Sequence, residues 1–121
     1  MHTIKVMQRG PLEGIKLERA LKLFPNYYEL YDAQNDALNF LSDSNVELES
    51  NNTWDYSPMA YVDYTTAMGP VIRFLHCPNN YQDILDYLED NGFNVIKFKK
   101  SRIGSYDRDP NTSLLVQVGT D

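Results

Sequence analysis

Short apolar runs bounded by turn residues predict five β-strands in the chain. In several of them apolar and polar side chains alternate, which places the apolar ones on a single face, as with Ile4 and Val6. The predicted strands are Thr3–Gln8, Met59–Thr66, Val71–Cys77, Phe93–Lys100 and Ser113–Gly119. The turn at 67–70 joins the second strand to the third, so we expect these two to form an antiparallel hairpin. The polar stretch 43–57 is expected to be loop, with room for a short strand at Val46–Glu49.

Other segments repeat their apolar residues with the period of an α-helix. The first follows Leu12 and ends at Pro25, and its apolar stripe is Leu17, Ala20, Leu21 and Phe24. The last follows Pro78 and is closed by Asn91-Gly92, because glycine accepts the left-handed conformation at a helix end. Its apolar face is Tyr81, Ile84, Leu85 and Leu88.

A helix between these two is predicted after Asn26, because Asn26 and Glu29 stand at the spacing of a capping box. Its apolar side would be Leu30, Ala33, Ala37, Leu38 and Leu41. A short strand at 27–31 is the alternative, since adjacent tyrosines favour an extended backbone.

The order of the predicted elements, β-α-α-β-β-α-β-β, indicates an α+β fold. We expect helices packed on one face of a mixed, mostly antiparallel sheet that leans toward the ferredoxin-like pattern. The strand, helix and strand between residues 71 and 100 predict a βαβ unit with parallel strands. A chain of 121 residues fits a single globular domain, residues 1–121.

Charge is distributed unevenly along the chain, which has a formal net charge of −6. No lysine or arginine stands between Lys22 and Arg73, whereas that stretch holds eight carboxylates and nine of the fifteen aromatic residues. A surface that combines carboxylates with rings attracts cationic partners and offers them anchoring contacts. The alternative is that the acidity only keeps the protein soluble.

We therefore predict a small acidic binding protein, an inhibitor or adaptor that occupies a basic groove of a partner protein. Rings would supply affinity, and carboxylates would raise the association rate. The predicted contact residues are Tyr27, Tyr28, Glu29, Tyr31, Asp32, Asp36, Asp43, Glu47, Glu49, Trp54, Asp55 and Tyr56. If the groove normally holds nucleic acid, the protein would act as a DNA mimic. Phage-encoded inhibitors of host defence proteins often have this composition.

A basic run near the C-terminal end forms a second candidate surface: Lys97, Lys99, Lys100, Arg102 and Arg108. Phe98 and Tyr106 are interleaved with it, so it could follow a phosphate backbone. The alternatives are that its lysines protect the edge of a sheet or pair with the acidic middle of the chain. We expect one of these alternatives and no direct contact with nucleic acid.

Signatures of catalysis are absent from the sequence, so we expect a protein that is not an enzyme, with no cofactor and no metal. The glycines form neither a phosphate-binding loop nor a dinucleotide motif. His76-Cys77 could be a nucleophile and its base, but neighbours in a strand point to opposite faces. Calcium loops need a glycine in the turn, and none lies between Gly14 and Gly69.

The stretch Val71–Val118 resembles half of an amino-acid-binding regulatory domain of ferredoxin-like topology. That resemblance implies a small-molecule sensor as the alternative function, with an enzyme of unknown reaction in reserve. The chain has neither a signal peptide nor a long apolar segment, so we expect a cytoplasmic protein, in the host cytoplasm if it is viral, without membrane contact. An exposed sheet edge could pair with a second copy to form a homodimer.

Overall fold

The computed structural model of the protein describes residues 2–49, 59–102 and 112–119. The elements follow the order that the hydrophobic pattern predicts, with the first strand divided in two. They are β1 (His2–Thr3), β2 (Lys5–Val6), α1 (Ile15–Leu23), α2 (Tyr27–Asp43), β3 (Glu47–Leu48), β4 (Met59–Thr66), β5 (Gly69–Phe74), α3 (Tyr81–Asp90), β6 (Asn94–Arg102) and β7 (Thr112–Gly119).

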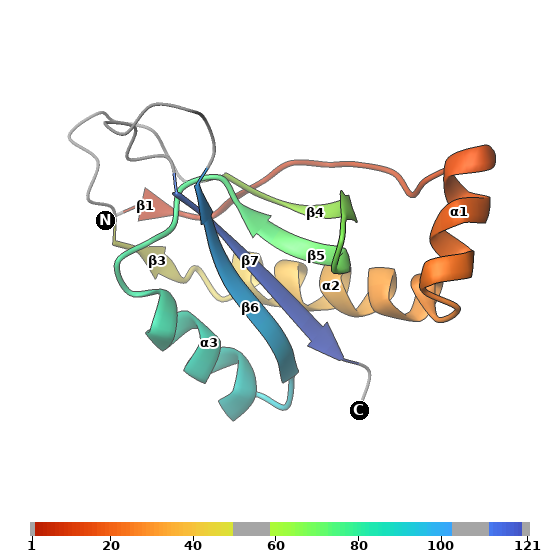
Figure 1. Cartoon of the computed structure of the whole chain (residues 1–121). Helices are drawn as coiled ribbons and strands as arrows, with labels where there is room; N and C mark the ends of the chain where they lie inside the picture. The colour runs from red at the N-terminus through yellow and green to blue at the C-terminus, as the bar shows by residue number, and fades with distance from the viewer. Residues whose placement is uncertain (1, 50–58, 103–111, 120–121) are drawn as a thin grey trace.

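Five of the strands form one sheet in the order β2-β4-β5-β7-β6. Figure 1 labels four of them: β4, β5, β7 and β6. Only β2 and β4 run parallel; the other neighbours in this sheet are antiparallel. The two remaining strands, β1 and β3, pair antiparallel in a small separate sheet. The fold is thus α+β with a mixed, mostly antiparallel sheet, as the sequence predicts.

Two helices cover the same face of the sheet. α2 packs across β4, β5 and β7, and α3 packs on β6. Alternate residues of the strands point toward them, because successive side chains of a strand face opposite sides. The core between sheet and helices includes Ala37, Leu38 and Leu41 from α2, Ile84, Leu85 and Leu88 from α3, and Ala60, Val62, Ile72, Phe74, Leu114, Val116 and Val118 from the strands.

The predicted βαβ unit is wrong in its strand pairing. β5 and β6 do run in the same direction, but β7 lies between them and is antiparallel to both. The result is a split β-α-β arrangement, the feature that this fold shares with the ferredoxin-like pattern. β7 lies between β5 and β6 because this position buries its apolar residues Leu114, Val116 and Val118. β5 and β6 therefore do not pair directly.

The first helix, α1, stands at one end of the molecule instead of on the sheet face (Figure 1). None of its residues is fully buried, and Ile15 and Leu23 are largely exposed. The ring of Phe24, just after α1, lies against Gly69 at the hairpin turn, where an added Cβ would come within 3.1 Å of the ring. Gly69 also has a φ of +81°, which other residues rarely adopt. A side chain at this position would therefore both meet the Phe24 ring and strain the backbone.

The start of α2 differs from the cap predicted at Asn26, whereas the end of α3 agrees with the prediction. Asn26 and Asn80 each precede a helix, but neither side chain bonds to the helix it precedes. Asn80 instead accepts a hydrogen bond from the backbone nitrogen of Glu49 and donates one to the carbonyl of Glu47, which fixes β3 against the start of α3. At the other end of α3, Gly92 adopts a φ of +92° and closes the helix as predicted.

Candidate functional site

Four carboxylates form a line along the solvent side of α2. Glu29, Asp36 and Asp43 are spaced seven residues apart, which is nearly two helical turns, and Asp32 lies beside them. All four are exposed, whereas the buried residues of α2 face the opposite side. We call these four residues the acidic stripe. It extends about 21 Å along the helix, because each residue adds about 1.5 Å.

A groove of about 570 Å³ runs beside the first half of the stripe. Its acidic wall consists of Glu29, Asp32 and Asp36. The remaining lining residues come from three elements. Ala33 lies on α2, Gly92 and Phe93 lie in the turn after α3, and Gly119 ends β7. The groove therefore combines an apolar contact, from Ala33 and Phe93, with three negative charges.

These three carboxylates are not neutralised by the described part of the chain. Within the described ranges, no lysine or arginine lines the groove. The ion pair in the described residues joins two other side chains, Arg73 and Asp63. Glu29 lies in the first turn of α2, where the helix dipole favours a negative charge, but Asp32 and Asp36 have no such compensation. The groove is thus an open, negatively charged site.

Gln34 holds this groove together from the buried side of α2. Its side-chain amide donates to the carbonyls of Leu30, at 2.9 Å, and Val118, at 2.8 Å. Its Oε1 accepts a hydrogen bond of 2.9 Å from the Val118 backbone nitrogen. β5 pairs with β7 only as far as Val116, so Gln34 takes the place of a strand at the end of β7. This pairing fixes α2 beside Gly119, which is why the groove forms there.

The predicted tyrosine contacts separate into different roles. Tyr27 is fully buried, so it cannot be a surface anchor in this conformation. Its hydroxyl instead accepts a hydrogen bond from the backbone nitrogen of Leu12, and burial raises the pKa of that hydroxyl. Tyr31 stacks on Tyr27 and donates its hydroxyl hydrogen to the Arg9 carbonyl. Tyr28 packs edge-on against Tyr27 but is 50% exposed, so among these three tyrosines it offers the most open ring beside the acidic stripe.

The remaining predicted contacts lie elsewhere. Glu47 is on β3 and Glu49 directly follows it, both exposed and beyond the C-terminal end of α2, so they do not line the groove. Trp54, Asp55 and Tyr56 lie outside the described residues. Sequence reasoning missed Ala33 as a groove residue and missed Phe93, Gly92 and Gly119 as well, because these come from three different elements that only the tertiary fold brings together.

The predicted basic patch lies on β6, an edge strand of the sheet. Lys97, Lys99 and Lys100 are exposed there. Lys97 and Lys99 stand opposite Gln117 and Leu115 of β7 in the strand register. The ammonium of Lys100 lies 4.2 Å from the centre of the Tyr81 ring, at the start of α3. The side chain of Arg102 and all of Arg108 lie outside the described part. An edge position suits lysines that prevent unwanted strand pairing.

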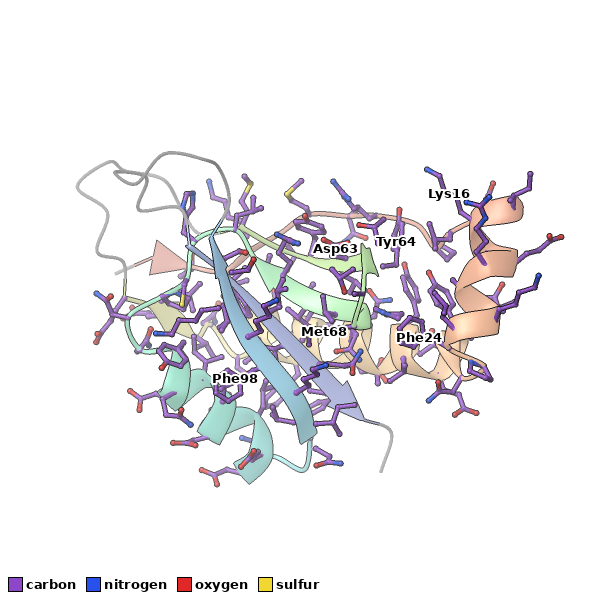
Figure 2. The ribbon with its side chains drawn as sticks, in the orientation of Figure 1. Lys16, Phe24, Asp63, Tyr64, Met68 and Phe98 are labelled. Atoms are coloured by element: carbon purple, nitrogen blue, oxygen red, sulfur yellow. The ribbon has the colours of Figure 1, made fainter. Side chains whose placement is uncertain are left out.

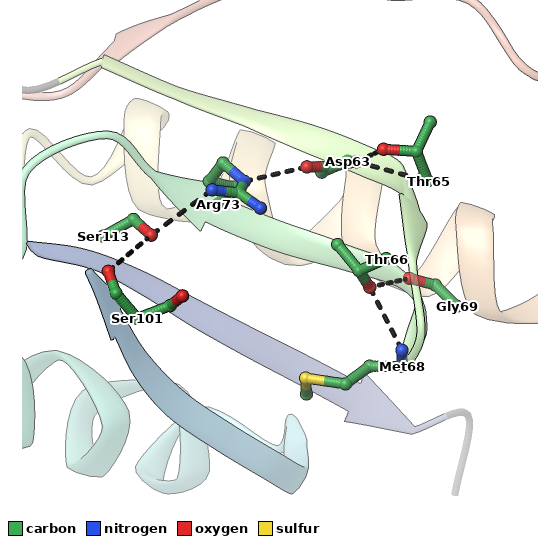
Figure 3. Close-up of polar contacts among 8 residues, drawn as sticks. All are labelled: Asp63, Thr65, Thr66, Met68, Gly69, Arg73, Ser101 and Ser113. Atoms are coloured by element: carbon green, nitrogen blue, oxygen red, sulfur yellow. Dashed lines mark hydrogen bonds and ion pairs between the residues drawn. The ribbon is translucent and has the colours of Figure 1, made fainter. Parts of the chain in front are cut away.

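A second polar cluster lies on the sheet face away from α2 and α3 (Figure 3). Asp63 accepts hydrogen bonds from the Thr65 backbone nitrogen and hydroxyl and from Arg73, whose Nε is 2.8 Å away. Burial by itself would raise the pKa of Asp63, but these bonds outweigh it and lower the pKa. Arg73 also donates to Ser113, which donates to the Ser101 carbonyl. With its partners satisfied in this way, Asp63 is suited to a structural role.

Features that indicate other chemistry are weak in the described residues. Cys77 is half-buried beyond the end of β5, and burial raises the pKa of its thiol, which disfavours the reactive thiolate. No group of three or more ligating side chains within residues 2–49, 59–102 and 112–119 is placed to hold a metal ion. In the same ranges, no helix has both the length and the apolar character needed to cross a membrane.

Comparison with known proteins gives no family assignment. The chain matches no protein-family model, and neither the curated proteins nor the solved structures give a significant match.

Proposed function

We propose that the protein is a small binding protein, an inhibitor or adaptor, that docks a basic segment of a partner protein along the acidic stripe of α2. The observation that carries the proposal is the open groove that Glu29, Asp32 and Asp36 line together with apolar residues and, in the described part of the chain, without a lining cation. Carboxylates left without an internal partner are available to an external one, and their field would attract a basic partner before contact.

The shape of the groove suits the side chains of lysine and arginine. Both have an apolar stem that packs on apolar surface while the charged head stays at a polar edge. In this groove the stem would lie on Ala33 and Phe93, and the head would reach Asp32 or Asp36. Arginine adds a flat guanidinium that binds a carboxylate through two parallel hydrogen bonds.

The length of the stripe indicates the form of the partner. A helix that carries basic residues at i, i+3 and i+7 presents its charges with the spacing of Glu29, Asp32 and Asp36. The exposed ring of Tyr28 lies at the N-terminal end of the same surface and could add an aromatic contact. If the partner surface normally holds a phosphate backbone, this protein would compete with nucleic acid for it.

Charge reversal on the stripe tests the proposal. The probe is a fluorescent helical peptide with lysines at i, i+3 and i+7, and its association is followed by stopped-flow anisotropy at low and high salt. Asp32→Lys with Asp36→Lys should slow association by about tenfold or more at low salt and flatten its salt dependence. The binding partner itself would then be identified by capture from a cell lysate.

The matched control is Asp83→Lys with Asp86→Lys on α3. Both residues are exposed, and their reversal changes the net charge by the same amount on another helix. If the control slows the peptide as much as the stripe variant does, the effect is one of net charge alone and the site proposal is refuted.

A further inference from the structure

A second pocket, of about 340 Å³, lies between α1 and the end of the β4–β5 hairpin. Its size falls at the lower end of the range for small-molecule sites, about 300–1,000 Å³. Figure 2 shows Phe24 and Tyr64 side by side between α1 and the strands, with Lys16 on α1 above them. Leu12, Ala20 and Phe24 supply apolar lining. The pocket shares no lining residue with the acidic groove.

The charge of this pocket is opposite to that of the molecule. Among the residues that the structure describes, Lys16 and Arg19 line it and no aspartate or glutamate does, although the chain has a net charge of −6. Neither cation has an ion-pair partner among the described residues. Both stand on the same side of α1 as the apolar Ala20 and Leu23, so two positive charges border an apolar hollow.

The polar groups at the strand end do not neutralise these cations. The Thr66 hydroxyl donates to the Gly69 carbonyl and accepts from the Met68 nitrogen, and the Thr65 hydroxyl donates to Asp63 (Figure 3). Their hydrogen atoms are therefore committed to the hairpin itself. The positively charged donors at the pocket are those of Lys16 and Arg19, which can donate but cannot accept, and Tyr64 adds a neutral hydroxyl to the lining.

We propose that this pocket binds a small carboxylate with a short aliphatic tail. The tail would lie on Leu12, Ala20 and Phe24, and the carboxylate would bind Arg19 through paired hydrogen bonds, with Lys16 as the second cation. A cationic ligand would meet two like charges, and a purely polar anion would leave the apolar lining uncovered. The proposal is independent of the acidic groove and of any protein partner.

The segments on either side of α1 are attached to the hairpin and to α2. The Phe24 ring packs on Gly69, and the chain before α1 is attached to α2 through the Tyr27 and Tyr31 hydroxyls. α1 itself is covered on one side only, and its Leu23 is 75% exposed. A ligand between α1 and the hairpin would therefore cover apolar surface that the protein alone leaves open.

Calorimetric titration with octanoate tests this inference, with octylammonium as a probe of the same tail and opposite charge. Octanoate should bind saturably, and octylammonium should bind at least about tenfold more weakly. Arg19→Glu with Lys16→Glu should weaken octanoate by about tenfold or more, which corresponds to about 1.4 kcal/mol. Both residues are exposed, so these changes leave no cavity in the core, and circular dichroism would confirm the fold.

The control is Lys22→Glu, an exposed cation of α1 that does not line the pocket. It should leave octanoate affinity within about twofold of the wild type, since its charge is screened by solvent. Asp32→Lys with Asp36→Lys should also leave it unchanged, which separates this site from the acidic groove. Equal binding of the two probes, equal affinity in the reversed variant, or no saturable binding at millimolar octanoate would each overturn the inference.

Discussion

Replacing Gln34 with leucine should destabilise the protein more than any surface change on α2. The side chain is fully buried and makes three hydrogen bonds, two of them to the backbone of Val118. Leucine has similar volume but leaves the Val118 N–H and C=O groups without partners away from water. Each unsatisfied buried group costs about 1–3 kcal/mol, so the expected loss in the free energy of unfolding is about 2–4 kcal/mol after the gain from apolar burial.

Urea unfolding followed by circular dichroism measures this loss. Asn39→Ala is the control, because Asn39 is exposed on the same helix and should change stability by less than about 0.5 kcal/mol. Gln34→Glu makes the test sharper, since an ionised carboxylate can accept from Val118 but cannot donate to either carbonyl. Burial raises the pKa of such a carboxyl in the folded state, so this variant should regain stability relative to the wild type as the pH falls.

The reasoning fails if Gln34→Leu unfolds at the same urea concentration as Asn39→Ala. In that case the Val118 backbone groups would have other partners, and Gln34 would not fix α2 against β7. Hydrogen exchange at the Val118 amide gives an independent measurement, because loss of its acceptor should speed exchange even where global stability is retained.

Two further predictions concern the hairpin and the end of α3. The pKa of Asp63 is lowered in the folded state, so its stabilising contribution is present above the unfolded pKa of about 3.9 and is lost as the pH falls through the lower folded value. The free energy of unfolding of the wild type and of Asp63→Asn, measured against pH, should therefore differ less and less over that range. A difference in stability that does not depend on pH would contradict this prediction. Gly92→Ala should lower the free energy of unfolding, measured by thermal unfolding, by about 1 kcal/mol, because the φ of Gly92 is +92°. Gly10→Ala is the control and should cost less, because Gly10 has no positive φ and no atom lies near an added Cβ. Equal losses of stability would refute the conformational explanation.

The hydrophobic pattern predicts which segments become helices and strands better than it predicts which strands become neighbours. α2 and α3 have apolar faces that continue for several turns, and β7 carries apolar residues at the alternate positions 114, 116 and 118. Neighbours depend on packing between distant segments. The direct pairing of β5 with β6 was a reasonable expectation from chain order, but burial of three alternate residues of β7 places that strand between them.

The candidate site was predictable only in part for the same reason. The seven-residue spacing of Glu29, Asp36 and Asp43 is visible in the sequence, and the helix places these residues on one exposed side. The opposite wall of the groove comes from residues more than fifty positions later, which no local pattern connects to α2. Gln34 does leave a local signal, because it is a polar residue within the apolar stripe, but its partner is 84 residues away.

Tyr27 shows a different limit. Composition suggests a surface contact, because tyrosine often joins a ring to a polar group at interfaces. Its burial is decided by the segment before α1, whose Leu12 nitrogen bonds to the Tyr27 hydroxyl. A tyrosine at the start of a helix carries no local signal that a distant segment will cover it.

The absence of fully buried residues in α1 has a consequence for how the molecule opens. Local unfolding requires least energy where few apolar contacts are lost, so α1 should detach and exchange its amides while the sheet, α2 and α3 remain folded. A protease should then cut first between residues 12 and 24 and leave a resistant remainder. Any compound that binds between α1 and the hairpin would slow that cleavage by mass action. The lifetime of the uncut chain in the presence of protease would therefore report how much of the compound is bound.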